Sequence, residues 1–503
     1  MNTTLVQHKA QPEIEQSYFS FKKEVGIDFL SMTLFFAGAV GAVYYMPKAV
    51  NMLYFLAIMV LFFRTEKDYF WYAFFFILIN TPAFLFFETS ATSLHRLPLY
   101  RLTGGVSLSV FDLFVLTSIA KVIYKNKQKP FHISKPLRFL LVYFALVSIP
   151  ITFLIGMGDS GFFNTFRPYF YYAVWVTFYF LVDDVKDVYM FGYLLVPYVF
   201  FTLFDQLFLL TQGELLISVI NPETLRYVVE NTITGGVRAY FSGFLLLFYI
   251  FLFGLQLRAN QKYELFNGFS YLIIFSCLLA FIISATRIYL LIPLAVLIMY
   301  FIFSDKGAAD FFRLTIAAAF FLVVFFSLDL ISFDYFLTSI WPRFEAFFSL
   351  IFSGGNITQF DTVQSRLATD LPHIMKGVEY SPVIGTGFSG VFREHENNDL
   401  GFINTVLIFG VVGFLIFLAV IISMIIKLRS WSSRLGGNAK TIVNTVWMAM
   451  FGIILGYATT FDIFTVRQID RIFFISILLA TAEVAVFQAT KRPDFLTKQS
   501  YKS

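Results

Sequence analysis

The sequence predicts an all-α polytopic membrane protein, and three observations carry this prediction. Of the 503 residues, 58% are hydrophobic and only 14% are charged, whereas a soluble chain carries about 25% charged residues. The mean hydropathy is +0.74. Apolar runs of about 17–25 residues, the length that crosses a bilayer as a helix, recur along the whole chain. This composition excludes a soluble enzyme, a secreted disulfide scaffold and a disordered chain, and it argues against a nucleic-acid partner.

We expect about fourteen membrane-spanning helices within a single integral membrane domain, residues 1–503. Three of the apolar runs (48–63, 168–182 and 288–303) are short, so the expected number is 12–14. No repeat, second domain or low-complexity linker interrupts the pattern. In chain order the expected spans are 25–45, 48–63, 69–87, 105–124, 137–156, 168–182, 188–211, 239–257, 267–285, 288–303, 312–331, 400–426, 441–460 and 472–489.

The distribution of Lys and Arg predicts the orientation of the chain. With the N-terminus in the cytoplasm and alternating spans, 24 of the 37 Lys and Arg residues lie on the cytoplasmic side. The lysine-rich segment 121–138 contributes most clearly to this excess. Because cytoplasmic loops of membrane proteins are enriched in Lys and Arg, both termini are expected in the cytoplasm, as an N-terminal segment 1–24 and a tail 490–503.

The 13 cations expected outside comprise 11 Arg and only 2 Lys. Topology does not require arginine there, and the planar guanidinium group binds phosphate with two parallel hydrogen bonds. An anionic ligand, with phosphate first, is therefore one interpretation, and ordinary pairing of these arginines with Asp and Glu is the other. Arg167, Arg238, Arg287, Arg467 and Arg471 lie near the expected outer helix ends, and Arg366 lies in the long loop 332–399. Arg287 is flanked by continuous apolar sequence, so either a functional role or snorkelling to the headgroups explains it.

One expected external loop, residues 332–399, is much longer than the others, and long loops in compact chains are usually functional. Within it we expect a helix over 361–378, since apolar residues recur every three or four positions, although Pro372 lies inside it. A Pro- and Gly-rich turn follows at 381–387, and then a polar cluster at 393–399. His395, Glu396 and Asp399 from this cluster are candidate acid–base groups, while Asp399 is alternatively an N-cap for the helix that begins near Leu400.

Several short motifs, in this order, resemble the O-antigen ligase and polymerase superfamily of bacterial inner-membrane proteins. The resemblance covers about residues 100–490, each motif is weak alone, and their order around one long external loop is more specific. The matching segments are Gly236-Val237-Arg238, Ser284-Ala285-Thr286-Arg287 with Leu291, Ser365-Arg366-Leu367, Pro382-Val383-Ile384-Gly385-Thr386-Gly387 and Phe409-Gly410-Val411-Val412-Gly413.

One departure from the family pattern favours the polymerase branch. The ligases carry a His-Asn pair about eleven residues before the first glycine of the Gly-x-x-Gly pair, but that position here is Asp399, with His395 four residues upstream. The segment 398–402, Asn-Asp-Leu-Gly-Phe, is more similar to Wzy-type polymerases. The identity of any general base therefore stays open among Asp399, His395 and Glu396.

The resemblance implies a GT-C-like glycosyltransferase of the inner membrane. It would polymerise oligosaccharide repeats linked to undecaprenyl pyrophosphate, at the periplasmic face, within lipopolysaccharide or related polysaccharide biosynthesis. Donor and acceptor lipid-linked glycans and membrane lipids are its implied partners, a chain-length regulator is a further one, and no cofactor or metal is expected. Arginine at the leaving pyrophosphate would stabilise the transition state. Arg287 and Arg238 are the first candidates for this role, and Arg366 and Arg167 follow.

Three alternatives stay open at this point. An O-antigen ligase of the same superfamily would transfer glycan to lipid A core. A flippase or transporter of the lipid-linked oligosaccharide would also suit many helices and a cationic cavity, but it predicts pseudo-repeats in the two halves, which the sequence lacks. A membrane receptor or scaffold would use the long loop as a partner site.

Overall fold

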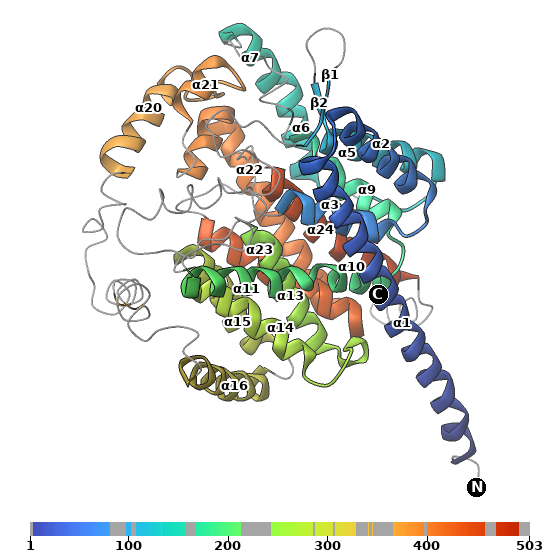
Figure 1. Ribbon diagram of the computed structural model, residues 1–503. Coiled ribbons are helices and arrows are strands. Elements are labelled where there is room, and N and C mark those ends of the chain that lie inside the picture. Colours follow the sequence, from blue (N-terminus) through green and yellow to red (C-terminus); the bar gives the residue numbers. More distant parts are fainter. Residues whose placement is uncertain are drawn as a thin grey trace, which may run out of the picture.

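Helices make up almost all of the described structure, a computed structural model (Figure 1). Their apolar composition explains this, because a chain within a bilayer must satisfy its backbone hydrogen bonds internally. The structure describes residues 4–80, 97–101, 107–131, 133–156, 167, 169–212, 243–284, 287–304, 307–327, 341, 345, 366–396, 400–457 and 469–491.

Each apolar run expected to span the membrane contains helix in the structure. The helices are α1 (Thr4–Tyr45), α2 (Lys48–Arg64), α3 (Asp68–Asn80), α5 (Val110–Lys125), α6 (Lys135–Tyr143) with the π-helix η1 (Phe144–Ser148) and α7 (Ile149–Ile155), α9 (Ala173–Leu181), α10 (Val185–Leu195), α11 (Pro197–Gln212), α13 (Phe244–Ala259), η3 (Gln261–Tyr263), α14 (Phe269–Ile283), α15 (Arg287–Phe303), α16 (Gly307–Ser327), α22 (Gly401–Arg434), α23 (Gly437–Tyr457) and α24 (Ile469–Thr490).

Within the described residues, six helical stretches are long and apolar enough to cross a membrane. The chain is therefore an α-helical membrane protein, while the number of fourteen spans and the GT-C architecture stay predictions. Three shorter apolar helices, Phe244–Ala259, Phe269–Ile283 and Tyr289–Phe303, add to the bundle. The six long stretches are Phe21–Tyr45, Lys135–Ile155, Val185–Leu209, Gly401–Arg434, Gly437–Leu455 and Ile469–Thr490.

The structure adds detail to the sequence-based expectation in two places and differs from it in one. The helix α1 begins at Thr4, within the segment 1–24 that is expected in the cytoplasm, and that location stays a prediction. The expected span 188–211 is found as the candidate span Val185–Leu209, which consists of α10 and α11, with the second beginning at Pro197, whose ring nitrogen cannot donate a helical hydrogen bond. The fold is also not entirely helical, since β1 (Leu99–Arg101) pairs antiparallel with β2 (Ser107–Ser109).

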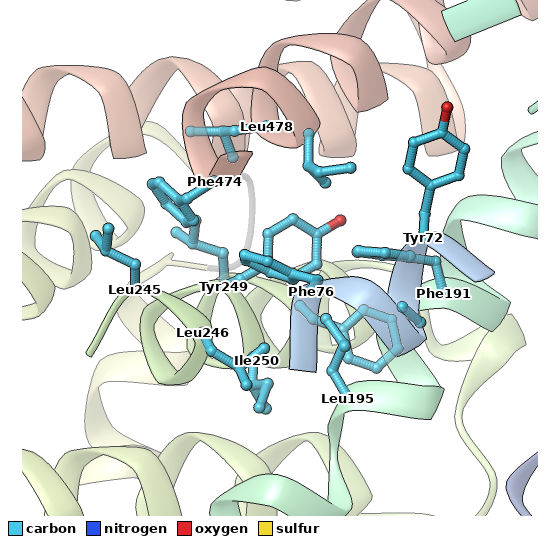
Figure 2. Packing of buried hydrophobic residues seen from close by; sticks show 14 of the residues in the cluster. Tyr72, Phe76, Phe191, Leu195, Leu245, Leu246, Tyr249, Ile250, Phe474 and Leu478 are labelled. Carbon is cyan, nitrogen blue, oxygen red and sulfur yellow. The ribbon is translucent and has the colours of Figure 1, made fainter. Parts of the chain in front are cut away.

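The main core is aromatic and lies where α3, α10, α13 and α24 meet (Figure 2). The ring of Phe76 stacks on Phe473 at 5.7 Å and on Phe191 at 6.1 Å, and the edge of Tyr249 meets it at 5.9 Å. Offset and edge-to-face ring pairs of this kind contribute about 0.5–1.5 kcal/mol each beyond their buried area. The phenylalanine-rich composition thus produces interlocked rings at the centre of the bundle as well as a lipid-facing surface.

Ion pairs gather at one end of the bundle, which the lysine excess predicts to be cytoplasmic. They join segments that are far apart in the sequence, as the alternating arrangement of the spans requires. Asp28 and Asp68 are buried, so removal of their lysine partners would leave an uncompensated buried charge, whereas Glu24 and Asp183 are more exposed. The pairs are Lys67–Asp28 (2.6 Å), Lys186–Glu24 (2.6 Å), Lys121–Asp68 (2.6 Å), Lys125–Asp68 (2.8 Å), Lys129–Asp183 (2.8 Å) and Lys127–Asp183.

The long loop forms a second, smaller core on one part of α22. Its described part contains the π-helix η6 (Arg366–Asp370), α20 (Leu371–Glu379) and α21 (Gly390–His395). Figure 1 shows α20 and α21 beside the N-terminal part of α22. This described part of the loop is therefore a packed element of the fold. Its core comprises Ile374, Val378, Phe388 and Phe392 from the loop with Leu407, Ile408 and Phe409 from α22.

Candidate functional site

The helix α22 is broken at Gly410, and this break anchors the long loop. Gly410 has φ 64° and ψ −178°, which lies outside the helical region, while the residues on both sides continue as helix. Such a break removes the helical partners of the carbonyl groups just before it and of the amide groups just after it. In lipid these groups need other partners, because unsatisfied backbone groups are costly there.

The motif at 382–387 supplies those partners through its own backbone. The amides of Thr386 and Gly387 donate to the carbonyl oxygens of Leu407 (2.8 Å) and Ile408 (2.9 Å). In the opposite direction, the amides of Val411 and Val412 donate to the carbonyl oxygens of residues 382 and 383, at 2.9 and 3.1 Å. Two of the motifs that resemble the family, 382–387 and 409–413, thus meet here, joined by four backbone hydrogen bonds.

Glycine is required at the two facing positions, Gly385 and Gly410. Gly385 has φ 78°, in the left-handed region that side chains other than glycine adopt with difficulty. A Cβ atom at Gly385 would overlap the carbonyl oxygen of Ile408, and one at Gly410 would overlap the carbonyl oxygen of Val383. The backbones therefore approach closely only because both residues lack a side chain.

The segment α6–η1–α7 contacts the opposite side of the loop from α22 through polar groups that lie along one helix face, which we call the polar stripe. The hydroxyl of Tyr143 donates to Phe409 O (2.7 Å) and lies 3.2 Å from Ile384 O. The amide of Phe388 donates to Thr152 Oγ1 (2.8 Å), and the amide of Gly390 donates to the carbonyl oxygen of residue 156 (2.9 Å). Ser148 belongs to the same face, since a Cβ atom at Gly387 would overlap its carbonyl oxygen. Positions 143, 148, 152 and 156 are separated by five, four and four residues, and the step of five coincides with the π-helix η1. The wider π turn keeps the stripe on the face that meets the loop.

Two histidines stack where α20 meets α21. The rings of His373 and His395 have centroids 5.0 Å apart and an interplanar angle of 21°. His395 is buried and its Nδ1 lies 3.0 Å from Val391 O. Because a carbonyl oxygen only accepts, Nδ1 carries the proton, and in the neutral ring Nε2 then has a lone pair that can take a proton. Among the candidate bases named from the sequence, His395 is thus the one whose ring orientation is fixed by a backbone contact at Nδ1.

Glu396 follows directly as the residue after α21, and it is half-buried. Asp399 lies outside the described residues, so its candidate role stays a prediction. Leu400 directly precedes α22 and makes no side-chain capping hydrogen bond, and the expectation that Asp399 caps this helix also stays a prediction. Of the expected helix 361–378, residues 361–365 lie outside the described residues and residues 366–378 are helical, with η6 passing into α20 and Pro372 at the second position of α20.

Arg167 is held by a carboxylate in the structure. Its guanidinium group donates through Nε to Asp112 Oδ1 (3.0 Å) and through Nη2 to Asp112 Oδ2. The same carboxylate accepts from the Tyr171 hydroxyl (2.7 Å) and from the backbone amide of Ser109 (2.6 Å). Burial by itself would lower the pKa of Arg167. The hydrogen bonds to Asp112 and its negative charge have the larger effect, so the pKa of Arg167 is raised. In this conformation the guanidinium fork binds Asp112, which matches ordinary pairing of an external arginine.

The other candidate arginines are described less fully. Arg287 is the first residue of α15 and Arg366 is the first residue of η6, and the structure describes only their backbone. Arg238 lies outside the described residues. The structure therefore brings His395 and Glu396 together on the loop, while the gathering of Arg287, Arg238 and Arg366 stays a prediction. In the described part of the chain no group of three His, Cys, Asp or Glu side chains is arranged to hold a metal ion.

Sequence reasoning missed Tyr143, Thr152 and Asp112. For Asp112 a signal exists, because Ser109 and Asp112 form a capping box in which each side chain accepts from the other's backbone amide. For Tyr143 and Thr152 no local signal exists, since their partners lie more than two hundred residues away in the sequence.

Comparison with known proteins identifies no relative. No family model matches the chain, and no curated protein and no solved structure is significantly similar to it.

Proposed function

We propose that this protein is a membrane-embedded glycosyltransferase. It polymerises undecaprenyl-pyrophosphate-linked oligosaccharide repeats at the periplasmic face of the bacterial inner membrane. The observation that carries the proposal is the pairing of the loop motif 382–387 with the break at Gly410. Two of the segments on which the family resemblance depends are thereby parts of one backbone structure, although more than twenty residues separate them.

The loop so anchored presents groups suited to activating a hydroxyl acceptor. His395 has its Nδ1 proton directed to a backbone carbonyl, which leaves Nε2 as the acceptor for the proton of the attacking sugar hydroxyl. In the proposed reaction the hydroxyl oxygen attacks the anomeric carbon, and the bond from that carbon to the pyrophosphate oxygen breaks. The pyrophosphate carries the released negative charge, which Arg287 and Arg238 would stabilise.

An in vivo assay tests the proposal. A deletion strain complemented with the wild-type gene should show a glycan ladder on gels, whereas the deletion strain should show caps of a single repeat. If the protein were a ligase, its deletion would leave no glycan on the lipid A core. A deletion strain without any capped core would therefore favour that alternative. An unchanged ladder in the deletion strain contradicts both enzyme assignments.

Variants of this gene test the residues. Arg287→Ala should reduce polymer formation by about 10²–10³-fold at equal membrane levels, since one preorganised donor is lost. Arg434→Ala is the control, because Arg434 is exposed at the C-terminal end of α22, well beyond the break at Gly410. It should leave the ladder unchanged. His395→Gln should reduce polymer formation by about 10²–10⁴-fold, because glutamine cannot accept the proton. Normal polymer from Arg287→Ala would remove the pyrophosphate role from this residue.

A further inference from the structure

An apolar groove lies between α6–η1 and the part of α22 that follows the break. Its volume is about 430 Å³, and its lining includes Phe139, Val142, Leu146, Val147, Ile416 and Ala419. The side chains on its α6 side face outward, with Leu146 71% and Phe139 66% exposed. Little of the span Lys135–Ile155 is buried in the protein. The groove is therefore open to the hydrocarbon of the bilayer along its length.

Two cations lie at the end of the groove where α6 begins. Lys135 is four residues before Phe139, and Arg138 is four residues before Val142, so each cation shares a helix face with a groove residue. Both side chains are exposed. The start of a membrane helix lies near the headgroup layer, where the long side chains of Lys and Arg extend toward phosphate.

We propose that the groove binds one acyl chain of an anionic phospholipid and that Lys135 and Arg138 bind its headgroup. The groove lining supplies no charged group, which suits a hydrocarbon chain and excludes a ligand that is polar along its length. The paired cations suit a headgroup with net negative charge, and each contributes about 1 kcal/mol of attraction at an anionic membrane surface, equivalent to about a fivefold change in binding. A zwitterionic lipid has no net charge to match them.

The bound lipid would brace the helix pair that carries the loop. Tyr143 lines the groove and also donates to Phe409 O at the break in α22. A chain in the groove fills the space between α6 and α22 just beyond this hydrogen bond. The lipid therefore fixes the spacing of the two helices between which residues 382–392 are held.

The test is native mass spectrometry of the full-length protein released from nanodiscs that contain equal amounts of dioleoyl phosphatidylglycerol and dioleoyl phosphatidylcholine. The wild type should retain one phosphatidylglycerol, favoured over phosphatidylcholine by about 25-fold if both cations act. Lys135→Gln and Arg138→Gln should each lower this preference by about fivefold. Lys48→Gln, an exposed cation at the start of α2, is the matched control and should not change it.

A second pair of variants separates the groove from the headgroup site. Ala419→Phe fills the groove and should abolish retention of the lipid, whereas Ala319→Phe, the same change at an exposed position on α16, should not. Equal retention of both lipids, or equal effects of the groove variant and its control, would overturn the proposal. Retention of an isoprenoid phosphate from native membranes in place of phosphatidylglycerol would also overturn it. None of these readouts requires polymerase activity, so they stand apart from the proposed function.

Discussion

Replacing Gly385 with alanine tests whether the long loop is anchored to α22 through its backbone. Gly385 has φ 78°, and an added Cβ would overlap Ile408 O and the amide nitrogen of Gly410. Neither contact can be relieved by moving a flexible side chain, because both atoms belong to the backbone. The segment 382–387 must therefore move away from the break.

The expected cost follows from the bonds that this movement breaks. Left-handed backbone at a residue with a side chain costs about 1–2 kcal/mol. Loss of the hydrogen bonds from the Thr386 and Gly387 amides leaves two buried carbonyl oxygens unpaired, at about 1–3 kcal/mol each. The anchored state of the loop should thus be destabilised by about 3–5 kcal/mol, since the displaced segment regains some hydrogen bonds.

Hydrogen exchange measured by mass spectrometry on the purified protein in detergent is the assay. For peptides that cover 384–390, protection in Gly385→Ala should fall by about 10²–10⁴-fold, which corresponds to that destabilisation. Two controls make the same change elsewhere. Gly268→Ala has φ 88° but open space around it, so it carries backbone strain alone, and Gly26→Ala in α1 also has open space and no positive φ.

The reasoning is refuted if Gly385→Ala loses no more protection at 384–390 than Gly268→Ala does. That result would mean that the close approach of the two backbones does not hold the loop. A uniform loss of protection over the whole chain would instead show global unfolding, and the comparison would then be made by limited proteolysis of the loop in membranes. Faster cleavage of the variant within 366–396 than of Gly268→Ala is the expected result there.

Three further predictions concern the neighbouring contacts. Tyr143→Phe should lower the thermal unfolding midpoint in detergent, because the carbonyl oxygen of Phe409 loses its hydrogen bond at a cost of about 1–3 kcal/mol. Tyr124→Phe, which changes an exposed ring, should leave the midpoint unchanged. Equal midpoints for the two variants would show that the Tyr143 hydroxyl contributes nothing to stability. Asp112→Asn should destabilise by about 3–5 kcal/mol because a partly buried arginine loses its charge partner, whereas Glu24→Gln, whose lysine partners are both more than 40% exposed, should change stability little. Similar losses in thermal unfolding would contradict this contrast. Burial raises the pKa of Asp183 but its two lysine partners outweigh this and lower it below its ordinary value of 3.8. The stabilisation from Asp183 is therefore present above that pH and lost as pH falls through the lower folded value. The midpoint difference between wild type and Asp183→Asn should vanish in acid, and a difference that persists there would disprove the linkage.

Much of the helical content was predictable because apolar runs leave the chain no alternative to helix in a bilayer. The same argument placed the helix α22 at about the right residues, but it did not find the break at Gly410. A run such as Phe409-Gly410-Val411 is apolar whether the helix is continuous or broken. The hydrogen bonds from the Thr386 and Gly387 amides to the carbonyl groups before Gly410 are what stabilise the break, and these bonds exist only in the tertiary structure.

The candidate site divides in the same way. The Pro- and Gly-rich turn and the polar cluster that includes His395 were found from the sequence, because those residue types mark turns and proton transfer wherever they occur. The pairing of Arg167 with Asp112 was left open, since a count of charges does not show which carboxylate an arginine reaches. The role of Tyr143 was not predictable, because its hydroxyl donates a hydrogen bond to the carbonyl oxygen of Phe409, which lies 266 residues further along the chain.

The sequence by itself determined that this protein is an α-helical membrane protein with one long loop and few charges, because length, hydropathy and charge are additive along the chain. The tertiary structure alone decided that the loop is anchored in a broken helix, that a π turn keeps the Tyr143–Thr152 stripe in register, and that Arg167 is paired. These features depend on which backbone groups meet across hundreds of residues. The pattern of side chains along one segment does not contain that information.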